Sequence, residues 1–131
     1  MPQSYDDPRH RGVVAVVVRD GRFLVIRRSN RVVAPGMICF PGGGVEADES
    51  EEETLIREIR EELGVEIEVG EQVTVVRHAY THFRITLHAF RCRLVAGEPR
   101  CLDCAAFRWV VTAELEALPM SVADRKIAQS L

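Results

Sequence analysis

Three glutamates, Glu58, Glu61 and Glu62, have the residue spacing that brings side chains onto one face of an α-helix. Like charges at this spacing repel one another, so a solvated helix usually intersperses them with cations. Mg²⁺ binds carboxylate oxygens together with substrate phosphates, and it would relieve this repulsion. The spacing therefore indicates a divalent cation site, whereas we interpret the acidic run at 51–53 as a solvated helix face.

A glycine-rich turn at 41–44 and a charged helix must position these glutamates. Ser50 and Glu53 have the spacing of a capping box, which predicts that the helix begins near Glu51. Gly64 can adopt the left-handed conformation that ends a helix. An apolar stripe predicts the face that packs on the core: Leu55, Ile56, Ile59 and Leu63.

The turn and the helix together form one continuous motif. Gly43 is followed after five residues by Glu49, and after seven more by Arg57. Further fixed positions complete the motif: Glu58, Ile59, Glu61, Glu62, Gly64 and Val65. At every specified position this stretch resembles the Nudix box of the Nudix hydrolase family. So many fixed positions over one loop and helix make the pattern far more specific than a short glycine motif.

The resemblance implies a chemistry for the loop and the helix. In Nudix hydrolases they hold metals that activate hydrolysis of a nucleoside diphosphate linked to another group. By this resemblance Glu58 and Glu62 are the principal Mg²⁺ ligands, and Mn²⁺ is a possible substitute. Glu61 then holds a metal or its bound water, and the Gly42 carbonyl completes the set.

Other motif positions are expected to shape the site. We expect Arg57 to orient the loop by pairing with Glu49, and we interpret Gly43 and Gly64 as structural.

Two further residues outside the motif are candidates for the site. Arg27 and Arg28 end a predicted strand, where alternation sends their side chains to opposite faces. We expect Arg28 to face the substrate phosphates, although both arginines could instead be surface charges. Asp103 falls where MutT-like members of the family carry an extra carboxylate on a loop, but it could also be a plain loop aspartate. Either Glu61 or Asp103 would accept the proton of the attacking water.

The final helix bears on the choice of base. MutT-type enzymes for oxidised dGTP place an asparagine against the purine near the start of this helix. The nearest positions here are Val122, Ala123 and Asp124. Asp124 therefore either contacts the base or only caps the helix with Ser121, and we expect modest discrimination between bases.

Three functions remain open at this point. The preferred hypothesis is hydrolysis of a (deoxy)nucleoside triphosphate to a monophosphate and pyrophosphate, as in MutT-like housecleaning enzymes. A second takes ADP-ribose or a nucleotide sugar as substrate. A third is a non-catalytic oxidised-base or nucleotide binding module, because the string 78–83 resembles the C-terminal domain of the glycosylase MutY. The intact glutamates favour an enzyme over that module.

Composition narrows the class of protein. The chain has 131 residues and a net charge of −3, which fits one globular domain and gives no basic surface for duplex nucleic acid. We expect a loose tail at 1–11 and one domain at 12–131, as a monomer or homodimer. Without a signal peptide or membrane span in the sequence, we expect a cytoplasmic protein that binds no membrane. Its four cysteines should then be reduced, and Cys101 and Cys104 lack the second pair that a zinc site needs.

Hydrophobic periodicity and turn residues predict the remaining elements. We expect strands at 12–18, 23–28, 37–40, 66–69, 72–79, 83–95 and 105–111, and helices at 51–63, at 112–118 and from Ser121 to the C-terminus. This order favours an α/β fold, and the Nudix resemblance implies an α/β/α sandwich with a mixed β-sheet between helices.

Overall fold

A computed structural model of the chain describes residues 10–28, 36–81 and 84–131. The strands are β1 (Arg11–Arg19), β2 (Arg22–Arg27), β3 (Ile38–Cys39), β4 (Gly42–Gly44), β5 (Glu66–Ala79), β6 (Arg84–Ala96) and β7 (Ala106–Val110). The helices are α1 (Glu51–Leu63), α2 (Thr112–Ala117) and α3 (Val122–Gln129). No helix within the described ranges is long and apolar enough to cross a membrane.

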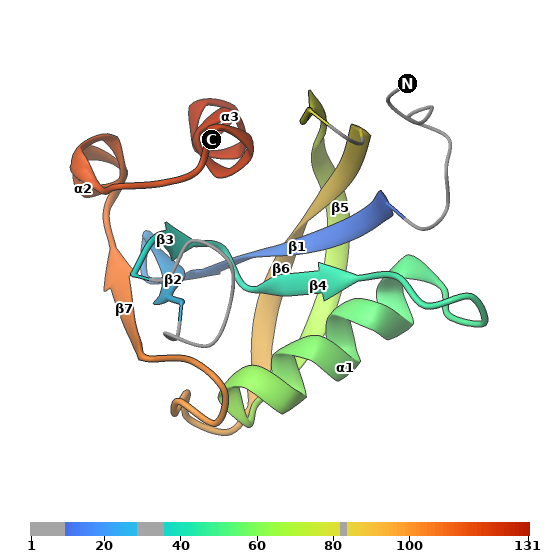
Figure 1. Cartoon of the computed structure of the whole chain (residues 1–131). Coiled ribbons are helices and arrows are strands. Elements are labelled where there is room, and N and C mark those ends of the chain that lie inside the picture. The colour runs from blue at the N-terminus through green and yellow to red at the C-terminus, as the bar shows by residue number, and fades with distance from the viewer. Residues whose placement is uncertain (1–9, 29–35, 82–83) are drawn as a thin grey trace.

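The strands form a mixed sheet with β1 near its centre (Figure 1). Its main path runs in the order β3-β2-β1-β6-β5, while β4 pairs with β1 and β7 pairs with β2. The pairing of β1 with β6 is parallel, and the other strand pairs are antiparallel. The predicted mixed sheet is confirmed.

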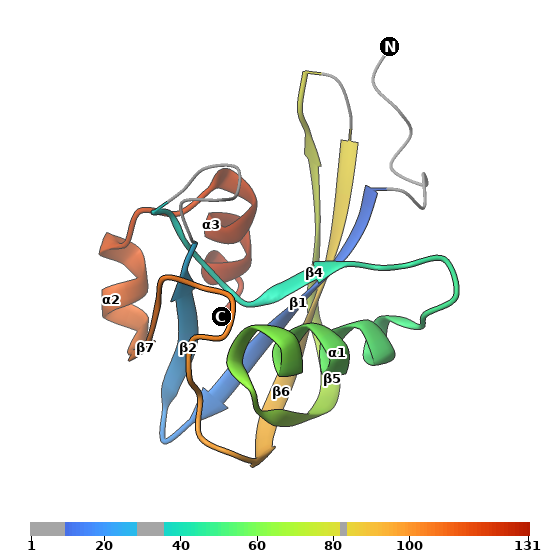
Figure 2. The ribbon, with the colours of Figure 1, turned by 60° about the horizontal axis from the view of Figure 1, so that its bottom comes forward.

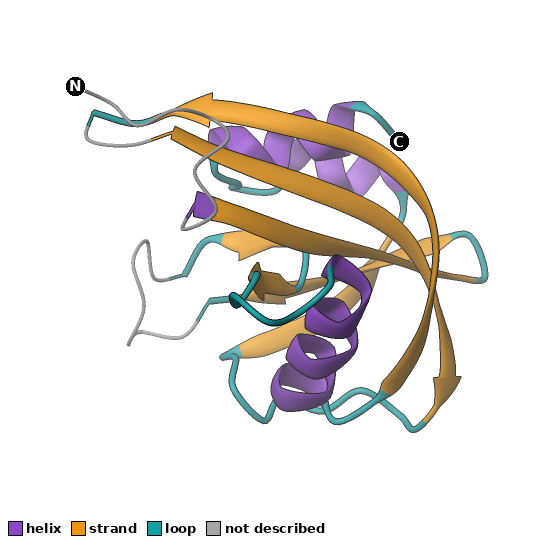
Figure 3. Cartoon of the chain, turned by 90° about the vertical axis from the view of Figure 1, so that its right-hand side faces the viewer, coloured by secondary structure: helices purple, strands orange, loops and turns teal. Residues whose placement is uncertain are grey.

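Helices cover both faces of the sheet (Figures 1 and 3). Alternate residues of β1 point to opposite faces, so this strand contributes to two apolar clusters. Val13, Ala15 and Val17 pack with the apolar residues of α1, whereas Val14 and Val16 pack with residues of α2 and α3. Burial on both faces explains the nearly unbroken valine run of this strand and confirms the α/β/α arrangement.

Local sequence signals define both ends of α1. The Ser50 hydroxyl accepts a hydrogen bond from the backbone N–H of Glu53 at 3.1 Å, and the Glu53 carboxylate accepts one from the N–H of Ser50 at 3.0 Å. Gly64 ends the helix with a φ of 67°. The predicted capping box and glycine cap are therefore present.

Two predicted turns are strands in the structure. Residues 42–44, expected in the glycine-rich turn, form β4, because they pair with β1. The strands expected at 66–69 and 72–79 are one strand, β5, because the turn predicted at Gly70 is absorbed as irregularities in its pairing with β6. Residues 1–9 of the tail predicted at 1–11, residues 29–35 of the loop predicted at 29–36 and residues 82–83 of the MutY-like string lie outside the described residues. Arg11, expected in the tail, is already the first residue of β1.

Candidate active site

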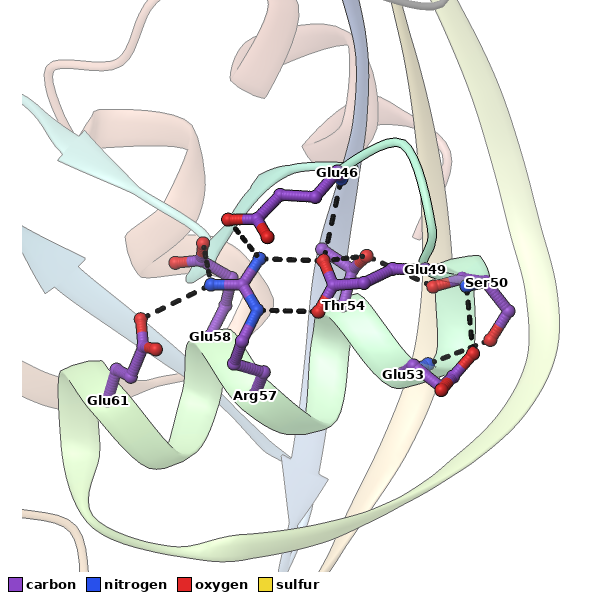
Figure 4. A network of polar contacts seen from close by, with 8 residues as sticks. All are labelled: Glu46, Glu49, Ser50, Glu53, Thr54, Arg57, Glu58 and Glu61. Atoms are coloured by element: carbon purple, nitrogen blue, oxygen red, sulfur yellow. Dashed lines mark hydrogen bonds and ion pairs between the residues drawn. The ribbon is translucent and has the colours of Figure 1, made fainter.

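Arg57 joins the loop before α1 to the glutamates on the helix (Figure 4). Its Nε and Nη2 donate to the two carboxylate oxygens of Glu49, at 2.6 and 2.8 Å. Nη1 of Arg57 donates to a carboxylate oxygen of Glu58 at 3.0 Å and to one of Glu61 at 3.3 Å. A carboxylate oxygen of Glu46 lies 3.6 Å from Nη2 of Arg57. The hydrogen bond from Arg57 lowers the pKa of Glu49 to about 2, so this bidentate pair stays charged. Arg57 thus holds the loop against the helix, in the orienting position expected from the sequence.

The backbone of β4 lies close to the glutamates on α1. A Cβ on Gly43 would lie 2.4 Å from the carboxylate carbon of Glu58, so a larger residue would displace that carboxylate. The backbone N–H of Gly42 donates a hydrogen bond to the carboxylate of Glu62. The glycine strand β4 therefore forms one wall of the acidic cluster.

Glu58 and Glu62 interact directly, and their hydrogen bond requires a shared proton. Burial, followed by the charge of Glu58, raises the pKa of Glu62 to about 8. Burial also raises the pKa of Glu58, while the neighbouring Arg57 opposes that shift. Two half-buried carboxylates that must share a proton form a site where a cation would be bound favourably.

A pocket of about 460 Å³ brings the candidate residues together. It is lined by the predicted catalytic, metal and substrate positions, Gly42, Glu58, Glu61, Glu62, Asp103, Arg28 and Asp124, and also by Gly43, which was predicted to be structural. Glu49, Arg57 and Gly64 do not line it, which is consistent with their structural interpretation. The helix α1, the strand β4 and the segment before β7 that carries Asp103 meet at this site (Figure 2).

Arg28 and Asp124 lie near each other in this pocket. Arg27 is exposed, whereas Arg28 is half-buried, so alternation separates them as expected. The Asp124 carboxylate accepts hydrogen bonds from the Phe40 backbone N–H at 3.3 Å and from the Ser121 hydroxyl at 2.9 Å. Burial raises the pKa of Asp124, and the positive charge of Arg28 acts against this shift. Asp124 therefore supports the Ser121 cap of α3 and lines the pocket at the same time.

Sequence reasoning missed several residues that line the pocket. Cys39 follows the apolar Ile38 in β3 and hydrogen bonds to the side chain of Arg28, but its sequence surroundings are those of an ordinary core residue. Arg11 and Tyr80 line the pocket from the ends of β1 and β5. Tyr80 is 42% exposed. Its place as an aromatic residue at the end of a predicted strand was the sequence signal that could have suggested it as a pocket residue.

The donor atoms fit a hard divalent cation. Glu58 and Glu62 present carboxylate oxygens beside the glycine strand, and oxygen ligands suit Mg²⁺ and Mn²⁺. Over the described ranges, no three His, Cys, Asp or Glu side chains are grouped closely enough to hold a metal. Glu61 does not complete such a group, because its exposed carboxylate is turned toward Arg57.

The NUDIX domain family model matches residues 13–130, nearly the whole described chain. The chain belongs to the NUDIX family. It is therefore an enzyme of the pyrophosphohydrolase class, and the resemblance inferred from the Glu58 helix is confirmed.

Relatives with known names agree with this assignment. The chain is 36% identical to a CTP pyrophosphohydrolase of Escherichia coli over 112 residues, which is 86% of this chain and 83% of the relative. It is 38% identical to a putative 8-oxo-dGTP diphosphatase 2 of Mycobacterium tuberculosis over 118 residues, or 86% and 81% of the two chains. A crystal structure of a MutT NUDIX hydrolase from Burkholderia pseudomallei superposes with a TM-score of 0.82 at 31% identity, covering 93% of this chain and 97% of that one.

Proposed function

We propose that this Nudix enzyme is a Mg²⁺-dependent nucleoside triphosphate pyrophosphohydrolase with modest discrimination between bases. Its products would be a nucleoside monophosphate and pyrophosphate. The observation that supports this most is that the helix glutamates share one pocket with Asp103, Arg28 and Asp124. Two relatives named for triphosphate substrates, CTP and 8-oxo-dGTP, point to the same substrate class.

Each residue has a role in this proposal. Glu58 and Glu62 would hold Mg²⁺ beside the backbone of Gly42, and Arg57 keeps Glu58 oriented through its own pairing with Glu49. When bound, Mg²⁺ lowers the pKa of water and neutralises phosphate oxygens. Arg28 would bind the phosphate chain, because a guanidinium pairs well with phosphate oxygens.

The acceptor of the water proton is Glu61 or Asp103. Both are exposed and line the pocket, so both can reach solvent and substrate. The Glu61 carboxylate accepts a hydrogen bond from Arg57 at 3.3 Å, while the backbone N–H of Asp103 donates to the Glu62 carbonyl at 3.2 Å. Comparing Glu61→Gln with Asp103→Asn would identify the acceptor, because only its loss removes the acidic limb of the pH–rate profile, where protonation of the base slows the reaction.

A substrate panel tests the proposed function. Purified protein with Mg²⁺ is offered CTP, dGTP, oxidised dGTP, ATP, ADP-ribose and a nucleotide sugar, and the nucleoside monophosphate released from each is measured by chromatography. We expect cleavage of the triphosphates, with differences of about ten- to a hundredfold between bases. Much faster cleavage of ADP-ribose than of every triphosphate would replace this proposal with the nucleotide-sugar hypothesis.

A cytoplasmic location stays a prediction.

A further inference from the structure

Cys101 and Cys104 form a thiol pair that the proposed reaction does not use. They lie in the segment between β6 and β7, and both are free thiols. The Cys104 Sγ donates a hydrogen bond to the Cys101 Sγ at 2.7 Å. The two sulfurs already face one another, so a covalent bond between them requires only a local movement.

Backbone hydrogen bonds place this pair beside the active site. The N–H groups of Leu102 and Asp103 donate to the carbonyl of Glu62, at 2.9 and 3.2 Å, and the N–H of Arg100 donates to the carbonyl of Leu63 at 3.1 Å. The segment is therefore attached to the end of α1 that carries Glu62. Asp103, which lines the pocket, stands between the two cysteines.

The two sulfurs differ in exposure. Cys101 is exposed, whereas Cys104 is half-buried and packs against the core cluster under α1. Burial, followed by the contact with Cys101, raises the pKa of Cys104 to about 12. Cys101 is therefore the sulfur that meets a reagent from solvent, and Cys104 lies behind it as the resolving thiol. The remaining cysteines, Cys39 and Cys92, are buried.

We propose that Cys101 and Cys104 are a reversible oxidation site for low-molecular-weight disulfides, and that the resulting bridge reduces turnover by restraining Asp103. Cys101 gives up its proton and attacks one sulfur of the disulfide RSSR, forming a mixed disulfide and releasing the first RSH. Cys104 then attacks the Cys101 sulfur and releases the second RSH, carrying away the second thiol proton. Two electrons pass from the protein to RSSR, and a small dithiol reverses the exchange.

The bridge would act on Asp103 through the backbone. It closes a ring of four residues, Cys101 to Cys104, with Asp103 inside it. In the dithiol form Asp103 is placed by its hydrogen bond to the Glu62 carbonyl, so drawing the sulfurs together disturbs that placement. The effect on turnover rests on the proposed function, whereas the oxidation itself does not.

Mass spectrometry of the intact chain tests the oxidation site. The protein is equilibrated with mixtures of oxidised and reduced glutathione, acid-quenched and weighed. We expect wild type to lose the mass of two hydrogens without gaining glutathione, and Cys104→Ser to gain one glutathione at Cys101. Cys101→Ser should do neither under the same mixtures. Wild type that stays fully reduced, or that accumulates only glutathione adducts, would overturn the site.

Turnover of the two forms tests the link to Asp103. We expect the oxidised wild type to hydrolyse its best triphosphate several-fold more slowly, and a small dithiol to restore the rate. The double variant Cys101→Ser/Cys104→Ser should be active and insensitive to the glutathione mixture. If the bridge forms and kcat is unchanged, the link to Asp103 is wrong although the oxidation site stands. If neither form cleaves any triphosphate, the proposed substrate class fails, and the mass measurement still decides the oxidation site.

Discussion

At the residue scale, Glu62 combines burial with a like-charged neighbour. Its carboxyl group shares a hydrogen bond with Glu58 and accepts another from the Gly42 N–H. The resulting rise of its pKa to about 8 means that, without a cation, the folded protein holds a proton that a solvated glutamate would have lost at neutral pH. In its charged form Glu62 therefore destabilises the folded state, and a bound cation would offset that destabilisation.

Replacing Glu62 with Gln should separate activity from stability. The amide keeps the shape of the side chain and removes its charge, so kcat/KM should fall about a hundredfold or more, as when one electrostatic contact to a transition state is lost. The melting temperature of the metal-free protein should hold or rise, because Gln is neutral without the proton that buried Glu62 must take up on folding. Glu52→Gln, on the exposed face of the same helix, is the matched control. Wild-type turnover in Glu62→Gln would show that the glutamate site is misassigned.

Asp124 has both a structural and a proposed specificity role, and one variant measures the two. Asp124→Ala removes the acceptor for the Phe40 N–H and the Ser121 hydroxyl, so the protein should lose about 1 kcal/mol of stability, as when a donor loses its hydrogen-bond partner. If Asp124 also reads the base, the ratios of kcat/KM among triphosphates should change by about tenfold or more. Thermal melts and the substrate panel give these two readouts separately. Unchanged ratios of kcat/KM together with a lower melting temperature would mean that Asp124 has only its structural role at the start of α3.

At the element scale, the loop and helix around Glu58 were predictable because their determinants are local. The capping pair Ser50–Glu53 and the final Gly64 act over a single helical turn, and the sequence shows them directly. The strand β4 was not predictable, because its three glycines have no strand propensity of their own. They form a strand only because β1 lies beside them in the folded chain.

The close approach of β4 to α1 leads to a prediction that compares two adjacent glycines. Gly43→Ala would place a Cβ 2.4 Å from the Glu58 carboxylate carbon, whereas a Cβ on Gly44 has nothing within 4 Å. Gly43→Ala should therefore displace Glu58 and lower turnover sharply, with little loss of stability because the displaced atoms are the end of a flexible side chain. Gly44→Ala should retain both activity and melting temperature. Equal turnover of the two variants would contradict this geometry, and thermal melts check their stability.

At the scale of the whole molecule, the pocket depends on contacts between distant parts of the sequence. Arg28 follows β2, Asp103 precedes β7 and Asp124 belongs to α3, yet all three line the pocket beside Glu62. The pairing of β2 with β7 brings the segments that carry Arg28 and Asp103 together, and local patterns do not encode such a pairing. Candidate residues could be chosen from motif and charge, but Cys39 and Arg11 join the site through tertiary packing alone.

The buried carboxyl groups should make the stability of the metal-free protein depend on pH. Burial raises the pKa of Glu62 from 4.5 to about 8, and it also raises those of Glu58 and Asp124. Over this interval the folded state binds more protons than the unfolded state, so the free energy of unfolding should fall as the pH rises from about 4.5 to about 8. Glu49 acts in the opposite direction, but its pKa is lowered to about 2, so its contribution is lost only in more acidic solution.

Thermal melts in a chelating buffer across this interval measure the effect, with Glu62→Gln as the comparison. The melting temperature of wild type should fall toward the alkaline end, while that of Glu62→Gln should fall less, because the largest shift has been removed. Adding Mg²⁺ should raise the wild-type melting temperature most where Glu62 is ionised, since a ligand that binds only the folded state stabilises it. Parallel curves for the two proteins, with and without Mg²⁺, would show that Glu62 neither titrates in this range nor contributes to metal binding.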